Sequence, residues 1–131
     1  MPTTQRTNIS TGGPWEPIIG YSRAVKVGNV IHVSGTTAMT PEGLAGKNDP
    51  YAQTIQALKN IEAALKQAGA SLEDVVRTRI YMTDISQWEK VGRAHGELLG
   101  NVRPATTMVE VSKLIDADML VEIEAEAYLT I

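Results

Sequence analysis

The chain has 131 residues and contains no cysteine. This absence excludes disulfide bonds, thiolate nucleophiles and zinc sites built on cysteine, and it is consistent with a reducing compartment. The length predicts a single domain over residues 1–131. A domain of this size buries roughly 65–70% of the surface of its unfolded chain, so it needs no covalent cross-link.

Long apolar runs and basic clusters are missing as well. No apolar run approaches the roughly 20 residues that span a bilayer, and residues 1–10 are polar, without the apolar segment of a secretory signal. The formal net charge is −3, and lysine and arginine do not cluster. We therefore expect a soluble cytoplasmic protein that has neither a membrane nor a nucleic acid as its partner.

The motifs of several enzyme classes are also absent. The sequence holds no Walker A loop and no G-x-G-x-x-G for phosphate binding, no H-E-x-x-H for zinc, and no G-x-S-x-G for a serine nucleophile. His32 and His95 are the only histidines. We interpret His95 as a packing residue of a helix and His32 as a structural residue of a strand. No metal and no cofactor are predicted.

Strand patterns occupy both ends of the chain. Two β-rich runs, 21–27 and 30–34, flank Gly28-Asn29, which is typical of a β-hairpin. Residues 75–82, 105–111 and 119–131 predict three more strands, and residues 7–10 are a candidate edge strand. Residues 1–20 otherwise predict a loop, as do residues 36–48, because glycine and proline interrupt both segments.

Two amphipathic helices are predicted between the strands. Asp49 and Pro50 suit the N-cap and first position of a helix with apolar residues at 55, 58, 61, 65 and 68, and Gly69 is its expected end. Ser86 is a candidate cap for a second helix. Its expected apolar face consists of Trp88, Val91, His95 and Leu98.

This order of elements predicts an α+β fold, a mixed β-sheet with both helices packed on one face. The other face stays uncovered and presents side chains such as Val109 and Val111 or their neighbours. Exposed apolar patches usually mark interfaces. We therefore expect an oligomer in which the bare face of the sheet packs on its copies.

Acidic residues alternate along the last predicted strand. Glu122, Glu124 and Glu126 share one face, and the basic residues Arg77 and Arg79 alternate in the same way on another strand. A glutamate that is left in a buried cleft has a raised pKa and can act as a general acid or base near neutral pH. The spacing does not identify which glutamate takes this role.

Three segments together resemble the Rid family, also called YjgF or L-PSP proteins. They are "VKVGNVIHVSGTT", "IQALKNIEAALKQAGASLEDVVRTRIYMTDI" and "RPATTMVEVSKL" followed by "MLVEIEAEA". The resemblance implies a chorismate-mutase-like fold and a homotrimer with ligand clefts between subunits. It also implies hydrolysis of reactive enamines and imines, derived from amino acids, to keto acids and ammonia.

The resemblance assigns site residues one by one. It implies Tyr21 near the cleft, Gly35 with its backbone amide, and Glu122 as the catalytic, water-orienting carboxylate. The family's substrate-binding arginine in P-A-R-[ST] is replaced by Thr106, and a family asparagine by Gly92. The hydroxyls of Thr106 and Thr107 are the candidate substitutes for that arginine.

Two other arginines stand near the matched positions. Arg103 and Arg23 could supply a cation from another direction, but we interpret both as surface residues. We predict a divergent, Rid-like hydrolase or deaminase that acts on an imine, enamine or related neutral amide in an intersubunit cleft. Two alternatives stay open: a non-catalytic trimer that binds a small ligand, and an endoribonuclease of the L-PSP type, against which the acidic charge counts.

Overall fold

The computed structural model describes residues 5–130. Its main sheet has six strands in the order β1-β2-β3-β8-β6-β7. All neighbours are antiparallel except β6 and β7, which are parallel. The strands are β1 (Arg6–Ile9), β2 (Ala24–Val27), β3 (Val30–Thr36), β6 (Val75–Met82), β7 (Ala105–Glu110) and β8 (Val121–Tyr128), with a small separate hairpin of β4 (Met39–Thr40) and β5 (Gly43–Leu44).

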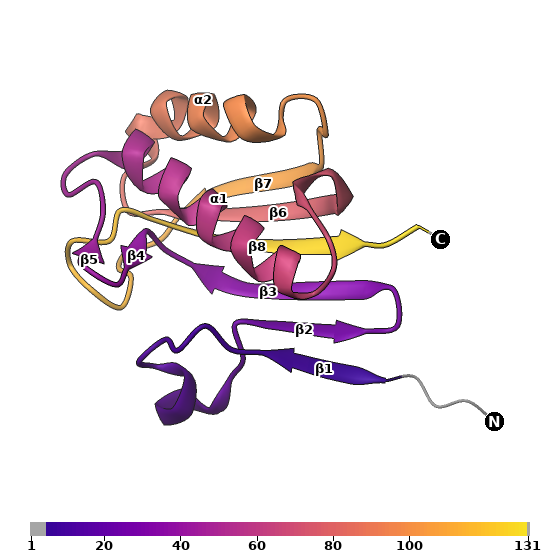
Figure 1. Cartoon of the computed structure of the whole chain (residues 1–131). Helices are drawn as coiled ribbons and strands as arrows, with labels where there is room; N and C mark the ends of the chain where they lie inside the picture. Colours follow the sequence, from indigo (N-terminus) through magenta and orange to yellow (C-terminus); the bar gives the residue numbers. More distant parts are fainter. Residues whose placement is uncertain (1–4, 131) are drawn as a thin grey trace.

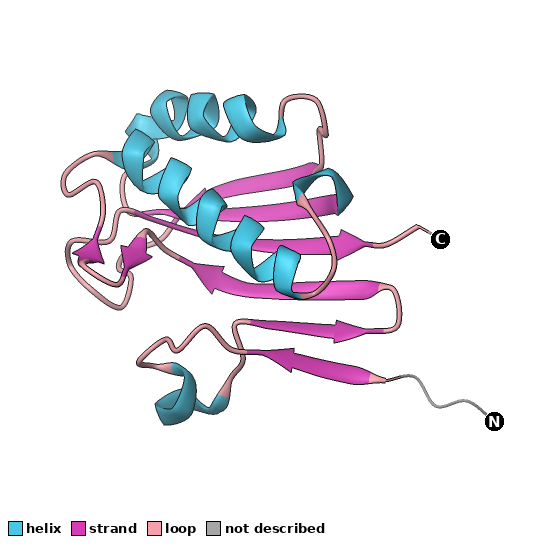
Figure 2. Cartoon of the chain, viewed as in Figure 1, coloured by secondary structure: helices cyan, strands magenta, loops and turns pink. Residues whose placement is uncertain are grey.

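Two long helices, α1 (Pro50–Gln67) and α2 (Trp88–Leu99), lie on the same side of this sheet (Figures 1 and 2). Three single turns complete the fold: η1 (Glu16–Gly20), η2 (Leu72–Asp74) and η3 (Ile85–Gln87). The predicted α+β fold, with both helices on one face, is therefore confirmed. None of the helices in the described part of the chain is both long and apolar enough to cross a membrane.

Helix α1 forms as its sequence predicts. The Asp49 side chain accepts a hydrogen bond from the Ala52 amide at 3.1 Å, and Pro50 opens the helix. Leu58, Ile61 and Leu65 are fully buried against the sheet. The helix ends at Gln67, and Gly69, predicted as its end, follows the cap residue Ala68 with a φ of +83°, which glycine adopts without strain.

Helix α2 differs from its prediction at its start. Asp84, and not Ser86, accepts the capping hydrogen bond, and it caps the turn η3 that precedes the helix. The predicted inward position of Trp88 is wrong, because its side chain is 55% exposed. The buried residues of α2 are Val91, Ala94 and Leu99, so the apolar face is rotated relative to the predicted one.

Strand β8 shows the predicted alternation. Val121, Ile123, Ala125 and Ala127 are buried toward the helices, whereas the three glutamates project from the opposite, open face. The strand is shorter than the predicted 119–131. Ile131 and residues 1–4, which the predictions of a final strand and a polar start include, lie outside the described residues.

The centre of the open face of the sheet is polar. Its two central strands, β8 and β6, present the glutamates opposite Arg77, Arg79 and Tyr81. Val109, one of the apolar residues predicted on this face, is exposed on the neighbouring β7. The face therefore combines a polar centre, where Glu126 pairs with Arg79 on the adjacent strand, with exposed apolar side chains beside it. Its packing on other copies of the chain stays a prediction.

Candidate functional site

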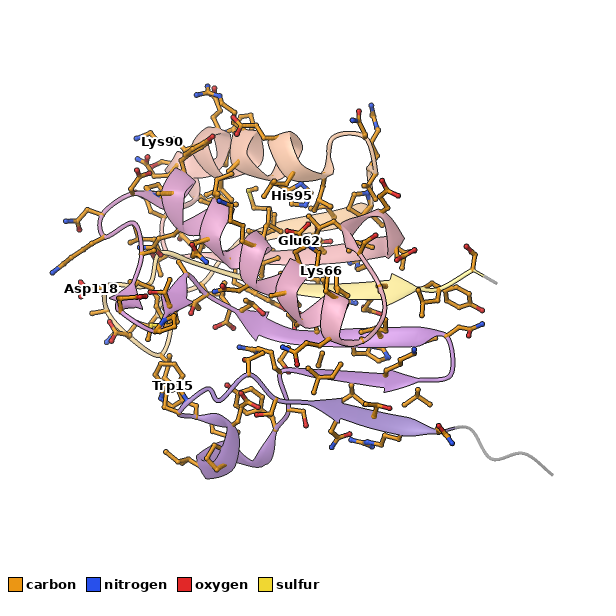
Figure 3. The ribbon with its side chains drawn as sticks, viewed as in Figure 1. Trp15, Glu62, Lys66, Lys90, His95 and Asp118 are labelled. Atoms are coloured by element: carbon orange, nitrogen blue, oxygen red, sulfur yellow. The ribbon has the colours of Figure 1, made fainter. Side chains whose placement is uncertain are left out.

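A cavity of about 460 Å³ opens where β3 ends and β8 begins. It is walled by the segment before β2, the end of β3, the loop between β7 and β8, and the start of β8. Figure 3 shows Trp15 on the N-terminal segment, toward the loop that carries Asp118. The lining residues are Trp15, Ile19, Tyr21, Arg23, Ser34, Gly35, Thr37, Leu114, Ile115, Met119, Glu122 and Glu124.

Glu122 lies against the backbone of Gly35 in this cavity. A Cβ atom at position 35 would stand 2.5 Å from Oε2 of Glu122, so only glycine permits this approach. The register between β3 and β8 shifts between Val33 and Thr36, which leaves Ser34 and Gly35 without a partner on β8. This irregularity places the glycine beside the carboxylate, and it brings together two of the residues that the family resemblance implies.

The structure distinguishes the three glutamates of β8. Glu126 accepts a hydrogen bond from Nη1 of Arg79 at 2.7 Å, and Glu124 accepts one from the Tyr81 hydroxyl at 2.7 Å. Within the described residues, the side chain of Glu122 has no hydrogen bond or salt bridge. Glu122 and Glu124 both line the cavity, and of the two only Glu122 has no hydrogen-bond partner in the described part of the chain.

The environment of Glu122 changes its proton affinity. Burial raises the pKa of Glu122 above its ordinary value, and the negative charge of Glu124 adds to this effect. The positive charge of Arg23 opposes the shift without reversing it. A carboxyl group with a raised pKa exchanges protons closer to neutral pH than an exposed glutamate does.

Arg23 lies in the cavity wall and not on the surface, so its interpretation as a surface residue is wrong. Its Nη2 atom donates a hydrogen bond to the Gly35 carbonyl at 2.5 Å. Its guanidinium carbon lies 5.6 Å from the centre of the Tyr21 ring, within the range of a cation–π contact. Arg103, by contrast, is exposed after α2, as predicted, with a φ of +55°.

Thr106 and Thr107 project from opposite faces of β7, and neither lines the cavity within one chain. Thr106 faces the helices, where its hydroxyl lies 2.7 Å from that of the buried Thr78, which in turn lies 2.9 Å from Nε2 of His95. Thr107 faces the open side and accepts a hydrogen bond from Arg77 at 3.0 Å. Their binding role stays a prediction, and it requires a neighbouring subunit.

The two histidines lie on opposite sides of the sheet. His95 is half-buried between α2 and the sheet (Figure 3), as predicted, and burial lowers the pKa of its imidazole. His32 is exposed on the open side, with Nδ1 3.8 Å from Glu126. Among residues 5–130, no group of three or more histidine, aspartate or glutamate side chains is placed to hold a metal ion.

Sequence reasoning missed much of the cavity wall. Trp15 and Ile19 belong to a segment that glycine and proline mark as a loop, and Leu114 and Met119 belong to the connection before β8. No periodic pattern in either segment indicates an inward side chain. A second cavity of about 470 Å³ adjoins the first and shares Trp15, Tyr21, Arg23 and Thr37 with it.

Comparisons with known proteins agree with this fold. The family model described as Endoribonuclease L-PSP matches residues 13–129. A RutC family protein of Pyrococcus abyssi is 44% identical over 114 residues, which cover 86% of this chain and 89% of the relative. Among solved structures, a member of the YjgF/YER057c/UK114 family from Mycobacterium tuberculosis is 53% identical with a TM-score of 0.89, covering 95% of this chain and 100% of that one.

A protein of the conserved Rid family from Yersinia pestis is 34% identical, with a TM-score of 0.83 and coverage of 95% of this chain and 100% of its own. These likenesses confirm the predicted chorismate-mutase-like α+β fold. The chain therefore belongs to the Rid family, also named YjgF or L-PSP.

Proposed function

We propose that this protein hydrolyses a small imine or enamine in the cavity, with Glu122 as the carboxyl group that transfers protons. One observation carries the proposal. Glu122 is the glutamate of β8 that lies in the cavity with a raised pKa and without a hydrogen-bond partner among the described residues. Glu124 and Glu126 are held by Tyr81 and Arg79 instead.

The reaction needs one water molecule and a group that both accepts and donates a proton. The water oxygen attacks the carbon of the C=N bond while the Glu122 carboxylate accepts the water proton. The carboxyl group then returns this proton to the nitrogen. In the resulting carbinolamine, the carboxyl group moves the hydroxyl proton to the nitrogen, so that the C–N bond breaks, ammonia leaves and the hydroxyl oxygen forms the carbonyl group. An enamine first takes a proton on carbon and enters the same sequence as an imine.

We further propose that the active form is a homotrimer whose cavities lie between subunits. Exposed apolar side chains at or beside the cavity support a covering copy: Ile18 is 79%, Ile19 62% and Ile115 57% exposed. Thr106 and Thr107 then reach a cavity only from the neighbouring subunit. Light scattering of the purified protein should give three times the chain mass, and a monomer mass with full activity would refute the trimer.

Replacement of the proposed acid–base group tests the reaction. Glu122→Gln keeps the shape of the side chain and removes its ionisation, so release of keto acid from the imine formed by serine dehydration should fall about 10²-fold or more. Glu126→Gln is the matched control, because it changes only contacts outside the cavity, with the half-exposed Arg79 and the exposed His32. It should retain turnover within a few-fold.

Two results would contradict this function. Unchanged turnover in Glu122→Gln would show that a group other than Glu122 transfers the protons. Wild-type turnover no faster than that of buffer, together with ligand binding in the cavity, would favour a non-catalytic binding protein. The separation of His32 from His95 by the sheet gives no support to cleavage of RNA by a histidine pair.

A further inference from the structure

Arg23 is the one basic side chain among the described residues that line the cavity, and also among those that line its neighbour. The guanidinium is held from two sides, by the Gly35 carbonyl and the ring of Tyr21. An arginine that is fixed before the ligand arrives loses little conformational freedom on binding, and its planar group matches a carboxylate.

Most of the hydrogen-bond donors of Arg23 are unused. A guanidinium offers five N–H groups, and one of them is engaged by the Gly35 carbonyl. Within the described residues, Nη1 has no partner, and the buried Nε has none either. The edge formed by Nη1 and Nη2 can therefore donate two parallel hydrogen bonds to one carboxylate.

The cavity presents two charged groups that a single ligand can contact. Arg23 and Glu122 line the same cavity, yet no salt bridge joins them among the described residues. A small acid that binds Arg23 through its carboxylate can then present its neighbouring carbon to Glu122. A volume of about 460 Å³ is typical of sites for small molecules.

We propose that Arg23 binds the anionic group of the ligand, so that the cavity selects small carboxylates over neutral compounds of the same shape. This rests on the function proposed above and names its substrate class: a short acid with the C=N bond next to its carboxylate. The cation comes from the segment before β2 and replaces the one that Thr106 cannot supply. Neutral imines and amides become the poorer ligands.

The test measures binding without turnover. Isothermal titration of the wild type with 2-oxobutanoate and with its neutral amide should show at least tenfold tighter binding of the acid. Arg23→Gln should abolish this preference, and Arg23→Lys should keep part of it, because lysine retains the charge and loses the fork. Arg103→Gln is the matched control, because it makes the same change at an exposed arginine, and it should leave the preference intact.

A second measurement uses the wild type alone, in case Arg23→Gln does not fold. The Nε–H resonance of Arg23 in a ¹⁵N NMR spectrum should shift on saturation with 2-oxobutanoate and should not shift with the amide. Equal affinity for the acid in wild type and Arg23→Gln would overturn the proposal, and so would loss of the preference in Arg103→Gln. An unmoved Arg23 resonance at saturation has the same consequence.

These outcomes are separate from those of the proposed function. Binding of the acid through Arg23 without any imine hydrolysis would refute the proposed hydrolytic reaction but support the role of Arg23 in binding. Hydrolysis that depends on Glu122, together with binding of the acid that is unchanged in Arg23→Gln, would support the proposed reaction and refute the role of Arg23.

Discussion

The contact between Gly35 and Glu122 predicts a large effect from one added methyl group. In Gly35→Ala, the new Cβ would lie 2.5 Å from Oε2 and 2.9 Å from Cδ of Glu122, whereas ordinary contacts begin at 3.4 Å. The carboxylate must therefore retreat by about 0.9 Å. Because the φ of Gly35 is not positive, the backbone itself accepts alanine.

This retreat should damage catalysis more than stability. A displacement of about 1 Å in a reacting group costs on the order of 10² in rate. The side chain of Glu122 can move into the cavity, so the free energy of unfolding should fall by no more than about 1–3 kcal/mol. The assay compares keto-acid release by the wild type, Gly35→Ala and Gly96→Ala. The last is a matched control, because a Cβ at Gly96 meets no atom within 4 Å.

The position of the carboxylate can also be followed without a substrate. A ¹³C NMR titration of the Glu122 carboxyl carbon should give a pKa in Gly35→Ala that differs from the raised wild-type value, because the group leaves its buried position. If Gly35→Ala keeps both full turnover and the wild-type titration, the close contact has no role in positioning Glu122. An equal loss of activity in Gly96→Ala would show that the effect is not specific to the cavity.

Two further predictions concern stability. Thr78→Val preserves the shape of the side chain but leaves His95 and Thr106 without their shared hydroxyl partner. Urea unfolding should show a loss of about 1–3 kcal/mol in the free energy of unfolding. An unchanged midpoint would show that these hydrogen bonds do not stabilise the fold. The pKa of Glu122 is higher in the folded protein than in the unfolded chain. Its favourable contribution to the free energy of unfolding is therefore complete below the pKa of the unfolded chain, and it is lost as the pH rises through the pKa of the folded protein. Glu122→Gln lacks this loss, so its stability relative to the wild type should increase from acid to neutral pH, and a constant difference would contradict the raised pKa.

The parts of the fold that sequence predicts well are those with a local physical cause. Helix α1 combines a capping aspartate, a proline at its first position and a single apolar stripe, and its observed bounds follow these signals. Strand β6 occupies the predicted residues 75–82. In β8, the strict alternation of glutamate with apolar residues fixes which face is buried, because side chains in a strand repeat every two residues.

The parts that residue spacing alone does not predict depend on contacts between distant segments. The selection of Glu122 among three glutamates follows from Tyr81 and Arg79 on the adjacent strand and from the irregularity at Gly35. None of these is visible in the spacing of β8 itself. The exposure of Trp88 has the same kind of origin, because the turn η3 precedes α2 and the buried face of the helix is set by Val91, Ala94 and Leu99.

The position of Arg23 shows why a comparison with the family motif does not describe the charge of this cavity. A comparison with the family motif finds threonine in place of arginine at position 106. This substitution alone predicts a ligand without a negative charge. In the fold, the side chain of Thr106 faces the helices of its own chain and lies outside the cavity of Glu122. Arg23 stands far from Thr106 in sequence, yet it shares that cavity with Glu122. Because segments that are distant in sequence line the cavity together, its charge depends on residues such as Arg23 that lie outside the motif around position 106.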